Sequence, residues 1–243
     1  MNSISSHAVV QTSDVGEGTR IDEFAVIRAS ARLGRGVIVH PYVFIGEGVS
    51  VGDGVEIFPG SVLGKEPKGA GATARQPQFE RRVSIGNNTS IGPHAVIFYD
   101  VIIGDNTLIG DGASIREQCR IGSKCIISRY VTINYHTIIG DRVKIMDQTH
   151  ITGNSTIEDD VFISLLVGSA NDNTPLAEGY EESRIVGCTI EKGALIGAGT
   201  TLMPGVVIGA GGMVGAGSVV SKNVEPNTLV IGSPARFVRR LGE

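Results

Sequence analysis

Two histidines and a few acidic and amide residues near the middle of the chain have side chains suited to proton transfer. His150 lies in the stretch KIMDQTHITGN, residues 144–154, shortly after Asp147. Imidazole titrates near neutral pH, so His150 is a candidate general base that removes a proton from an attacking group. A nearby carboxylate such as Asp147 or Asp172 could orient the ring and stabilise its charged form. The alternative interpretation is an ordinary polar surface residue.

A repeat of six residues organises the sequence around these groups. Isoleucine leads fourteen consecutive hexads between residues 85 and 163, and an aliphatic residue keeps the same spacing over residues 9–63 and 190–220. A period of six fits neither an amphipathic helix nor a simple strand alternation. The leading residue and a small residue four positions later, such as Thr107 or Cys119, are both expected to point inward. The pattern therefore predicts an all-β solenoid of short strands joined by corners.

The repeat converts sequence spacing into spatial proximity. Three hexads make one triangular coil, so the repeat predicts about ten coils and a prism roughly 48 Å long, at about 4.8 Å per stacked strand. Residues 18 apart then become vertical neighbours, and His150 is expected below Gly168. A second column is expected to contain Asp100, Gln118, His136 and Asn154, and to reach Asp172 if the loop keeps the register. The polar residues expected to converge at this edge are His150, His136, Asn154, Asn171 and Asp172.

Two segments interrupt the repeat. Residues 64–82 and 169–189 are rich in glycine, proline and charge, so they are expected to be loops that project from the prism. Surface insertions cost little, but loops of this length are more often functional. We expect a solenoid domain over residues 1–225 and a C-terminal capping segment over residues 226–243. Within the latter, PARFVRRL, which begins at Pro234, is predicted to form a short amphipathic helix over the open end.

Composition argues against several classes of function. The formal net charge is −4 with both signs interspersed, which disfavours binding to the DNA or RNA backbone. The chain has neither an N-terminal signal nor a run of 18 apolar residues, so we expect a cytoplasmic protein without a membrane span. Neither the histidines nor the cysteines have the spacing of a zinc site, so no metal is expected. Cys119 and Cys125 are interpreted as small apolar core residues, and Cys188 as a nucleophile is a weak competing hypothesis.

Several motifs resemble sugar N- and O-acyltransferases of the hexapeptide-repeat family over nearly the whole chain. They are VSIGNNTSIG, GDGASIREQCRIG, INYHTIIGDRVKIMDQTHITGNSTIEDDVFIS, SANDN and GALIGAGTTLMPGVVIG. The resemblance implies a left-handed parallel β-helix and a homotrimer with three sites in the clefts between subunits. It also implies direct attack of the acceptor on the thioester of acetyl-CoA, without an acyl-enzyme.

The resemblance also bears on the acceptor. IEDDVFIS followed by NDN is similar to acetyltransferases that act on nucleotide-linked amino sugars. GSVLGKEPKG resembles a loop of UDP-N-acetylglucosamine acyltransferase, but Tyr135, with His136 beside it, stands where that enzyme has its catalytic histidine. The sugar O-acetyltransferases have a histidine where this chain has Ala170, Asn171 and Asp172. These departures favour either His150 as the base or an amine acceptor that needs less help from a base. The catalytic candidates are His150, Asp147, Asn171, Asp172 and His136.

Two alternatives to N-acetylation of a nucleotide sugar stay open. One is a sugar O-acetyltransferase or a transferase of a longer acyl chain, and the other is a non-catalytic structural β-helix subunit. For acetyl-CoA, the glycine-rich coils around Gly197 and Ala198 would allow the pantetheine arm to approach backbone amides, although corners of a prism need glycine anyway. Lys222 and Arg239 are candidate partners of the CoA phosphates.

Overall fold

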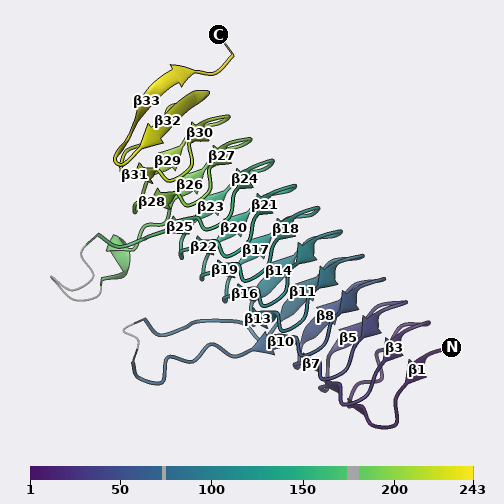
Figure 1. Ribbon diagram of the computed structural model, residues 1–243. Helices are drawn as coiled ribbons and strands as arrows, with labels where there is room; N and C mark the ends of the chain where they lie inside the picture. Colours follow the sequence, from purple (N-terminus) through teal and green to yellow (C-terminus); the bar gives the residue numbers. More distant parts are fainter. Residues whose placement is uncertain (73–74, 174–180, 243) are drawn as a thin grey trace.

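The computed structural model describes residues 1–72, 75–173 and 181–242 and is shown in Figure 1. Within these ranges the chain forms 33 strands, and its helical structure is a single 3-10 turn, η1 (Glu182–Arg184). The strands belong to three sheets, named A, B and C in the order in which each coil visits them. The predicted all-β solenoid is confirmed.

Each sheet consists of short strands stacked along the prism. Sheet A contains β1 (Ser3–Ile4), β3 (Arg20–Ile21), β6 (Ile38–Val39), β9 (Glu56–Ile57), β12 (Ser90–Ile91), β15 (Leu108–Ile109), β18 (Ile126–Ile127), β21 (Lys144–Ile145), β24 (Phe162–Ile163), β27 (Leu195–Ile196), β30 (Met213–Val214), β32 (Thr228–Gly232) and β33 (Ala235–Arg240). Sheet B contains β2 (Val9–Val10), β4 (Val26–Ile27), β7 (Phe44–Ile45), β10 (Val62–Lys65), β13 (Val96–Phe98), β16 (Ser114–Ile115), β19 (Thr132–Ile133), β22 (His150–Ile151), β25 (Gly168–Ser169), β28 (Thr201–Leu202) and β31 (Val219–Val220). Sheet C contains β5 (Arg32–Leu33), β8 (Val49–Val51), β11 (Val83–Ile85), β14 (Val101–Ile103), β17 (Arg120–Ile121), β20 (Ile138–Ile139), β23 (Thr156–Ile157), β26 (Thr189–Ile190) and β29 (Val207–Ile208).

The six-residue repeat places its aliphatic residues in one continuous core. Ile133 and Ile151 lead successive hexads of sheet B and are 0% exposed, and Cys119 fills a second inward position. Neighbouring coils align with the predicted offset, because Thr132 pairs with His150 and His150 pairs with Gly168. Since every coil pairs with the coils above and below it, a residue on an edge lies beside residues one coil away.

The C-terminal end of the prism differs from the prediction in two ways. Sheet A has twelve parallel strands, from β1 to β32, so the prism has about twelve coils rather than ten. The predicted helix is wrong, because PARFVRRL forms β33, which pairs antiparallel with β32. Phe237 and Val238 are exposed in this hairpin, so their apolar side chains do not cover the end of the prism as predicted. Pairing with β32 instead satisfies backbone groups that a short, marginal helix would satisfy poorly.

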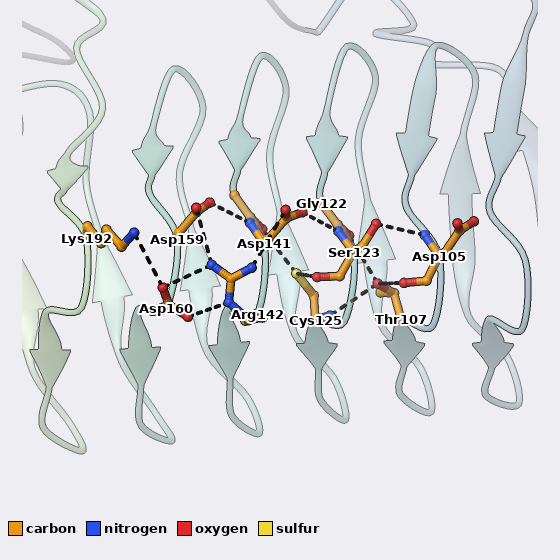
Figure 2. A network of polar contacts seen from close by, with 11 residues as sticks. Asp105, Thr107, Gly122, Ser123, Cys125, Asp141, Arg142, Asp159, Asp160 and Lys192 are labelled. Carbon is orange, nitrogen blue, oxygen red and sulfur yellow. Dashed lines mark hydrogen bonds and ion pairs between the residues drawn. The ribbon is translucent and has the colours of Figure 1, made fainter.

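The edge between sheets C and A is held by hydrogen bonds from side chains to the next coil (Figure 2). The Oδ1 atom of Asp141 accepts from the N–H of Ser123 at 2.7 Å, and Oδ1 of Asp159 accepts from the N–H of Asp141 at 2.9 Å. Arg142 donates to both carboxylate oxygens of Asp160, at 2.6 and 3.0 Å. Because these carboxylates bind neighbouring coils, we interpret the C–A edge as structural.

Candidate functional site

Both long interruptions of the repeat leave the prism at the edge between sheets B and C. Loop 1 (residues 66–82) joins β10 to β11, loop 2 (residues 170–188) joins β25 to β26, and Figure 1 shows both on the same side. A column of corner residues with positive φ angles lies between the two loops on this B–C edge. Its members are Asp100, Gln118, His136 and Asn154. The structure thus places His136 and Asn154 in one column, as the 18-residue spacing predicts.

A buried carboxylate, Glu117, lies at this edge. Its side chain is 0% exposed, and Oε1 accepts a hydrogen bond from Nη1 of Arg75 at 2.6 Å. Oε2 accepts from Nε of Arg116 at 2.9 Å. Burial by itself raises the pKa of Glu117, but the hydrogen bonds from Arg116 and Arg75 outweigh burial and hold the pKa below its usual value. The carboxylate is therefore ionised at neutral pH and anchors loop 1 through Arg75.

Arg75 links loop 1 to the histidine of the edge. Its guanidinium carbon lies 3.7 Å from the centre of the Tyr135 ring, and its Nη2 donates to Oε1 of Gln118 at 3.3 Å. The same Oε1 of Gln118 is hydrogen-bonded to Nε2 of His136. Among the described residues the guanidinium thus contacts Glu117, Tyr135 and Gln118, and the Arg75 side chain is only 11% exposed. Gln118 and His136 are thus connected to a loop whose root, at Arg82, lies two coils from Gln118 and three coils from His136.

The root of loop 2 lies against Asn154. The Nδ2 atom of Asn154 donates to the carbonyl of Ile185 at 2.8 Å, and the N–H of Val186 donates to the carbonyl of Asn171 at 2.9 Å. Asn171 also donates through Nδ2 to the carbonyl of Gly153 at 3.4 Å. Asn154 and Asn171 therefore hold both ends of loop 2 on the B–C edge, and Asp172 follows directly at the point where the chain leaves the coil.

His150 lies on the outward side of sheet B rather than on the edge column. It stands between Thr132 and Gly168, and its Nδ1 is 2.7 Å from Oγ1 of Thr132. Burial lowers the pKa of His150, so the ring is neutral at neutral pH and able to accept a proton.

The expected partnership between His150 and Asp147 does not form in this arrangement. Asp147 accepts hydrogen bonds from the hydroxyl of Ser128 and from Nη2 of Arg129. These two bonds hold the pKa of Asp147 below its usual value. Asp147 therefore stabilises the preceding coil through Ser128 and Arg129, and it is not the group that orients His150.

Two family models match this chain. "GMPPB C-terminal domain" matches residues 79–169, and "Bacterial transferase hexapeptide (six repeats)" matches residues 187–222. The second model describes the same six-residue unit that builds the coils. Over residues 187–222 the chain therefore has the repeat of the bacterial hexapeptide transferases. The predicted resemblance to that family and to its β-helix fold is confirmed.

Relatives of this hexapeptide-repeat protein are distant. The acyl-[acyl-carrier-protein]–UDP-N-acetylglucosamine O-acyltransferase of Chlamydia pneumoniae is 28% identical over 126 residues, which are 49% of this chain and 44% of the relative. The bifunctional protein GlmU of Clostridium botulinum is 28% identical over 123 residues, which are 47% of this chain and 27% of the relative. The chain therefore spans less than half the length of these relatives.

Solved structures show the same fold over nearly the whole chain. The Arabidopsis UDP-N-acetylglucosamine acyltransferase superimposes with a TM-score of 0.66 at 21% identity, covering 99% of this chain and 72% of that one. LpxA, a UDP-N-acetylglucosamine acyltransferase from Bacteroides fragilis, gives 0.58 at 17% identity, covering 97% and 74%. At these identities the superpositions establish the β-helix alone.

Gly197 and Ala198, expected to bind the donor in this hexapeptide-repeat chain, form a corner on the edge between sheets A and B. The N–H of Gly217 donates to the carbonyl of Ala198 at 2.8 Å. A Cβ on Gly197 would approach the backbone nitrogen of Ala216 to 2.4 Å. Close stacking of coils therefore accounts for glycine at 197 without a cofactor.

The two cationic residues expected to bind the CoA phosphates, Lys222 and Arg239, are likewise separate from that corner. Lys222 follows β31 and lines a cavity of about 350 Å³ together with Arg236 and Phe237 of β33. Arg239 pairs with Leu229 farther along the hairpin and does not line this cavity. Arg236, rather than Arg239, thus lines this cavity together with Lys222.

The sequence interpretation missed Arg75, Arg116 and Glu117. One signal was present, because Arg116 and Glu117 immediately precede Gln118 of the predicted polar column. A carboxylate inside a coil otherwise filled by small and aliphatic residues needs a cationic partner. No spacing rule identifies that partner, because Arg75 comes from outside the repeat.

Neither the cysteines nor a metal centre offers a competing site. All three cysteines are buried, and burial raises the pKa of the Cys119 thiol to about 12 and that of Cys125 to about 11. The pKa of Cys188 is raised by burial as well, which opposes a nucleophilic role. Across residues 1–72, 75–173 and 181–242, no three His, Cys, Asp or Glu side chains are grouped as metal ligands. No helix in these ranges could span a membrane.

Proposed function

We propose that this protein transfers an acyl group from a thioester to a hydroxyl of a nucleotide-linked sugar at the B–C edge. The observation that supports this most is the convergence of Arg75, Gln118 and His136 on the B–C edge, one coil from Asn154, which contacts the root of loop 2. The name of the matched Chlamydia relative describes O-acylation of UDP-N-acetylglucosamine. It favours the hydroxyl acceptor over the amine that the motifs alone favoured.

A hydroxyl acceptor needs a base, and His136 is the group that we assign to this role. In the proposed step, Nδ1 of His136 takes the hydroxyl proton while the oxygen attacks the thioester carbonyl carbon. The new C–O bond forms, the C–S bond breaks, and the imidazolium returns the proton to the leaving thiolate. His136 is exposed, and no hydrogen bond of its Nδ1 is found among the described residues. That nitrogen is therefore accessible to a substrate.

The remaining groups have supporting roles in this proposal. Asn154, Asn171 and Asp172 lie at the root of loop 2 and are proposed to position the sugar. Lys222 and Arg236 are proposed to hold a phosphate of the pantetheine arm, which acyl-CoA and acyl carrier protein both present. His150 is the alternative base, because its ring is neutral and lies on the adjoining face of sheet B. The homotrimer implied by the family resemblance stays a prediction that light scattering can test.

The direct test combines a substrate panel with histidine variants. Acetyl-CoA and acyl carrier proteins loaded with longer chains are each offered with UDP-N-acetylglucosamine and with amino-sugar nucleotides, and free thiol and product mass are measured. We expect His136→Ala to lower kcat by at least about 100-fold, the contribution of a general base. His94→Gln, on the edge between sheets A and B, is the matched control.

The outcomes separate the parts of the proposal. Absence of thiol release with every donor and acceptor contradicts acyl transfer and favours a structural subunit. If turnover survives in His136→Ala but is lost in His150→Ala, the general base is His150 on sheet B and not His136. If only amino-sugar nucleotides are converted, the acceptor is an amine and not a hydroxyl.

A further inference from the structure

The hydrogen bond between Gln118 and His136 admits two chemical forms. A glutamine amide can present either its carbonyl oxygen or its NH₂ group, depending on how the amide is turned. The facing imidazole nitrogen must then be a donor in the first form and an acceptor in the second. Which ring nitrogen of His136 holds the proton thus depends on the orientation of the Gln118 amide.

Arg75 removes this ambiguity. A guanidinium has only donors, so the Gln118 atom that faces Nη2 of Arg75 at 3.3 Å must be the carbonyl oxygen. Arg75 itself has little freedom, because Glu117 accepts from its Nη1 at 2.6 Å and the Tyr135 ring lies 3.7 Å from its guanidinium carbon. The carbonyl oxygen of Gln118 consequently faces both Arg75 and Nε2 of His136.

We infer that Arg75 of loop 1 is a positioning residue that, through Gln118, keeps the proton of neutral His136 on Nε2 and leaves Nδ1 free to accept one. This role rests on the proposed function of His136 as the base, but its structural part can be measured without turnover. Release of Arg75 from Glu117 and Tyr135 would let the Gln118 amide turn. His136 would then lose its fixed tautomer and its fixed ring orientation, so docking of loop 1 and readiness of the base are coupled.

The decisive experiment is NMR of the full chain labelled with ¹⁵N-histidine, at a pH where the ring is neutral. The signals of His136 are assigned by their loss in His136→Asn. In the natural chain we expect an unprotonated Nδ1 and a slowly exchanging Nε2 proton. In Arg75→Ala we expect that proton to exchange too fast to observe and the two ¹⁵N shifts to move towards each other. Arg81→Ala, in the same loop, should leave both signals in place.

The same Arg75→Ala substitution in a Gln118→Glu protein tests whether Arg75 acts on His136 through the amide of Gln118. In Gln118→Glu the facing group is a carboxylate, which has only acceptors, so the proton of His136 stays on Nε2 whether or not Arg75 is present. Arg75→Ala should therefore lose its effect on the His136 signals in this background. A merely structural role of Arg75 would disturb His136 equally in both backgrounds.

Kinetics supply an independent test once an acyl donor and an acceptor that the protein converts are known. Arg75→Ala should lower kcat about tenfold, the value of one hydrogen bond to a charged group, with little change in KM. Added methylguanidine should restore part of the loss. The inference is overturned if Nδ1 of His136 is protonated in the natural chain, or if the His136 signals are unchanged in Arg75→Ala. It is also overturned if Arg75→Ala disturbs those signals equally with Gln118 and with Glu at position 118. If the NMR signals behave as expected but no donor and acceptor are converted, only the proposed function is contradicted.

Discussion

Replacement of Glu117 by glutamine tests the anchor of loop 1 without changing the shape of the side chain. The substitution removes the charge to which Arg75 donates at 2.6 Å, at a site where Glu117 is 0% exposed and the Arg75 side chain is 11% exposed. A hydrogen bond to a charged group contributes about 1.5–3 kcal/mol, so we expect docking of Arg75 to weaken by about 2 kcal/mol. That value corresponds to roughly a 30-fold increase in the population of the open loop.

Trypsin reports this opening directly, because it can cleave after Arg75 only when the side chain is released. If the loop opens and closes rapidly, cleavage follows the open population and should be roughly 30-fold faster in Glu117→Gln. Cleavage after the exposed Lys68 in the same loop provides an internal reference. Glu66→Gln is the matched control, because Glu66 pairs with Arg81 at the exposed surface, where such pairs contribute little.

The effect should also depend on pH with a defined sign. The pKa of Glu117 is lower in the folded chain than its ordinary value of 4.5. Its stabilising contribution is therefore fully present above pH 4.5 and is lost as the pH falls through the lower, folded-state pKa. The reasoning is refuted if Glu117→Gln and the natural chain are cleaved at equal rates at neutral pH. It is also refuted if the difference between their cleavage rates persists unchanged in acid.

Three further predictions concern the core of the prism and the root of loop 2. Cys119 and Cys125 should resist alkylation in the native protein and react on unfolding, because burial raises their thiol pKa values to about 12 and about 11. Gly187→Ala should loosen loop 2, measured as faster proteolysis, because its Cβ would lie 2.4 Å from the carbonyl carbon of Asn154. Overpacking of this kind costs about 1–3 kcal/mol. Ile133→Ala should lower the free energy of unfolding by about 2–5 kcal/mol in urea titrations, because Ile133 is 0% exposed.

The regular part of the structure was predictable because the repeat is local and strict. Isoleucine at every sixth position fixes which residues point inward, and an 18-residue coil then fixes neighbours such as His150 and Gly168. The same rule placed His136 and Asn154 on one edge. The C-terminal hairpin escaped prediction, because PARFVRRL has a weak helical pattern and its real partner, β32, is outside the repeat.

The site was predictable only in part, for a physical reason. Column members follow from spacing, but side chains that reach across the edge from a loop do not. Arg75 lies in loop 1, and its contacts with Glu117 and Tyr135 depend on the path of the loop through space. Asp147 illustrates the opposite error: it is near His150 in sequence, yet its hydrogen bonds go to Ser128 and Arg129.

A crystal structure of the protein with CoA would test most directly whether chemistry takes place on the B–C edge. The account predicts that the thiol sulfur ends beside Nδ1 of His136, between loop 1 and the root of loop 2, with the amide oxygen of Gln118 on the opposite side of the ring. A thiol that ends on the edge between sheets A and B, or on that between sheets C and A, would contradict it.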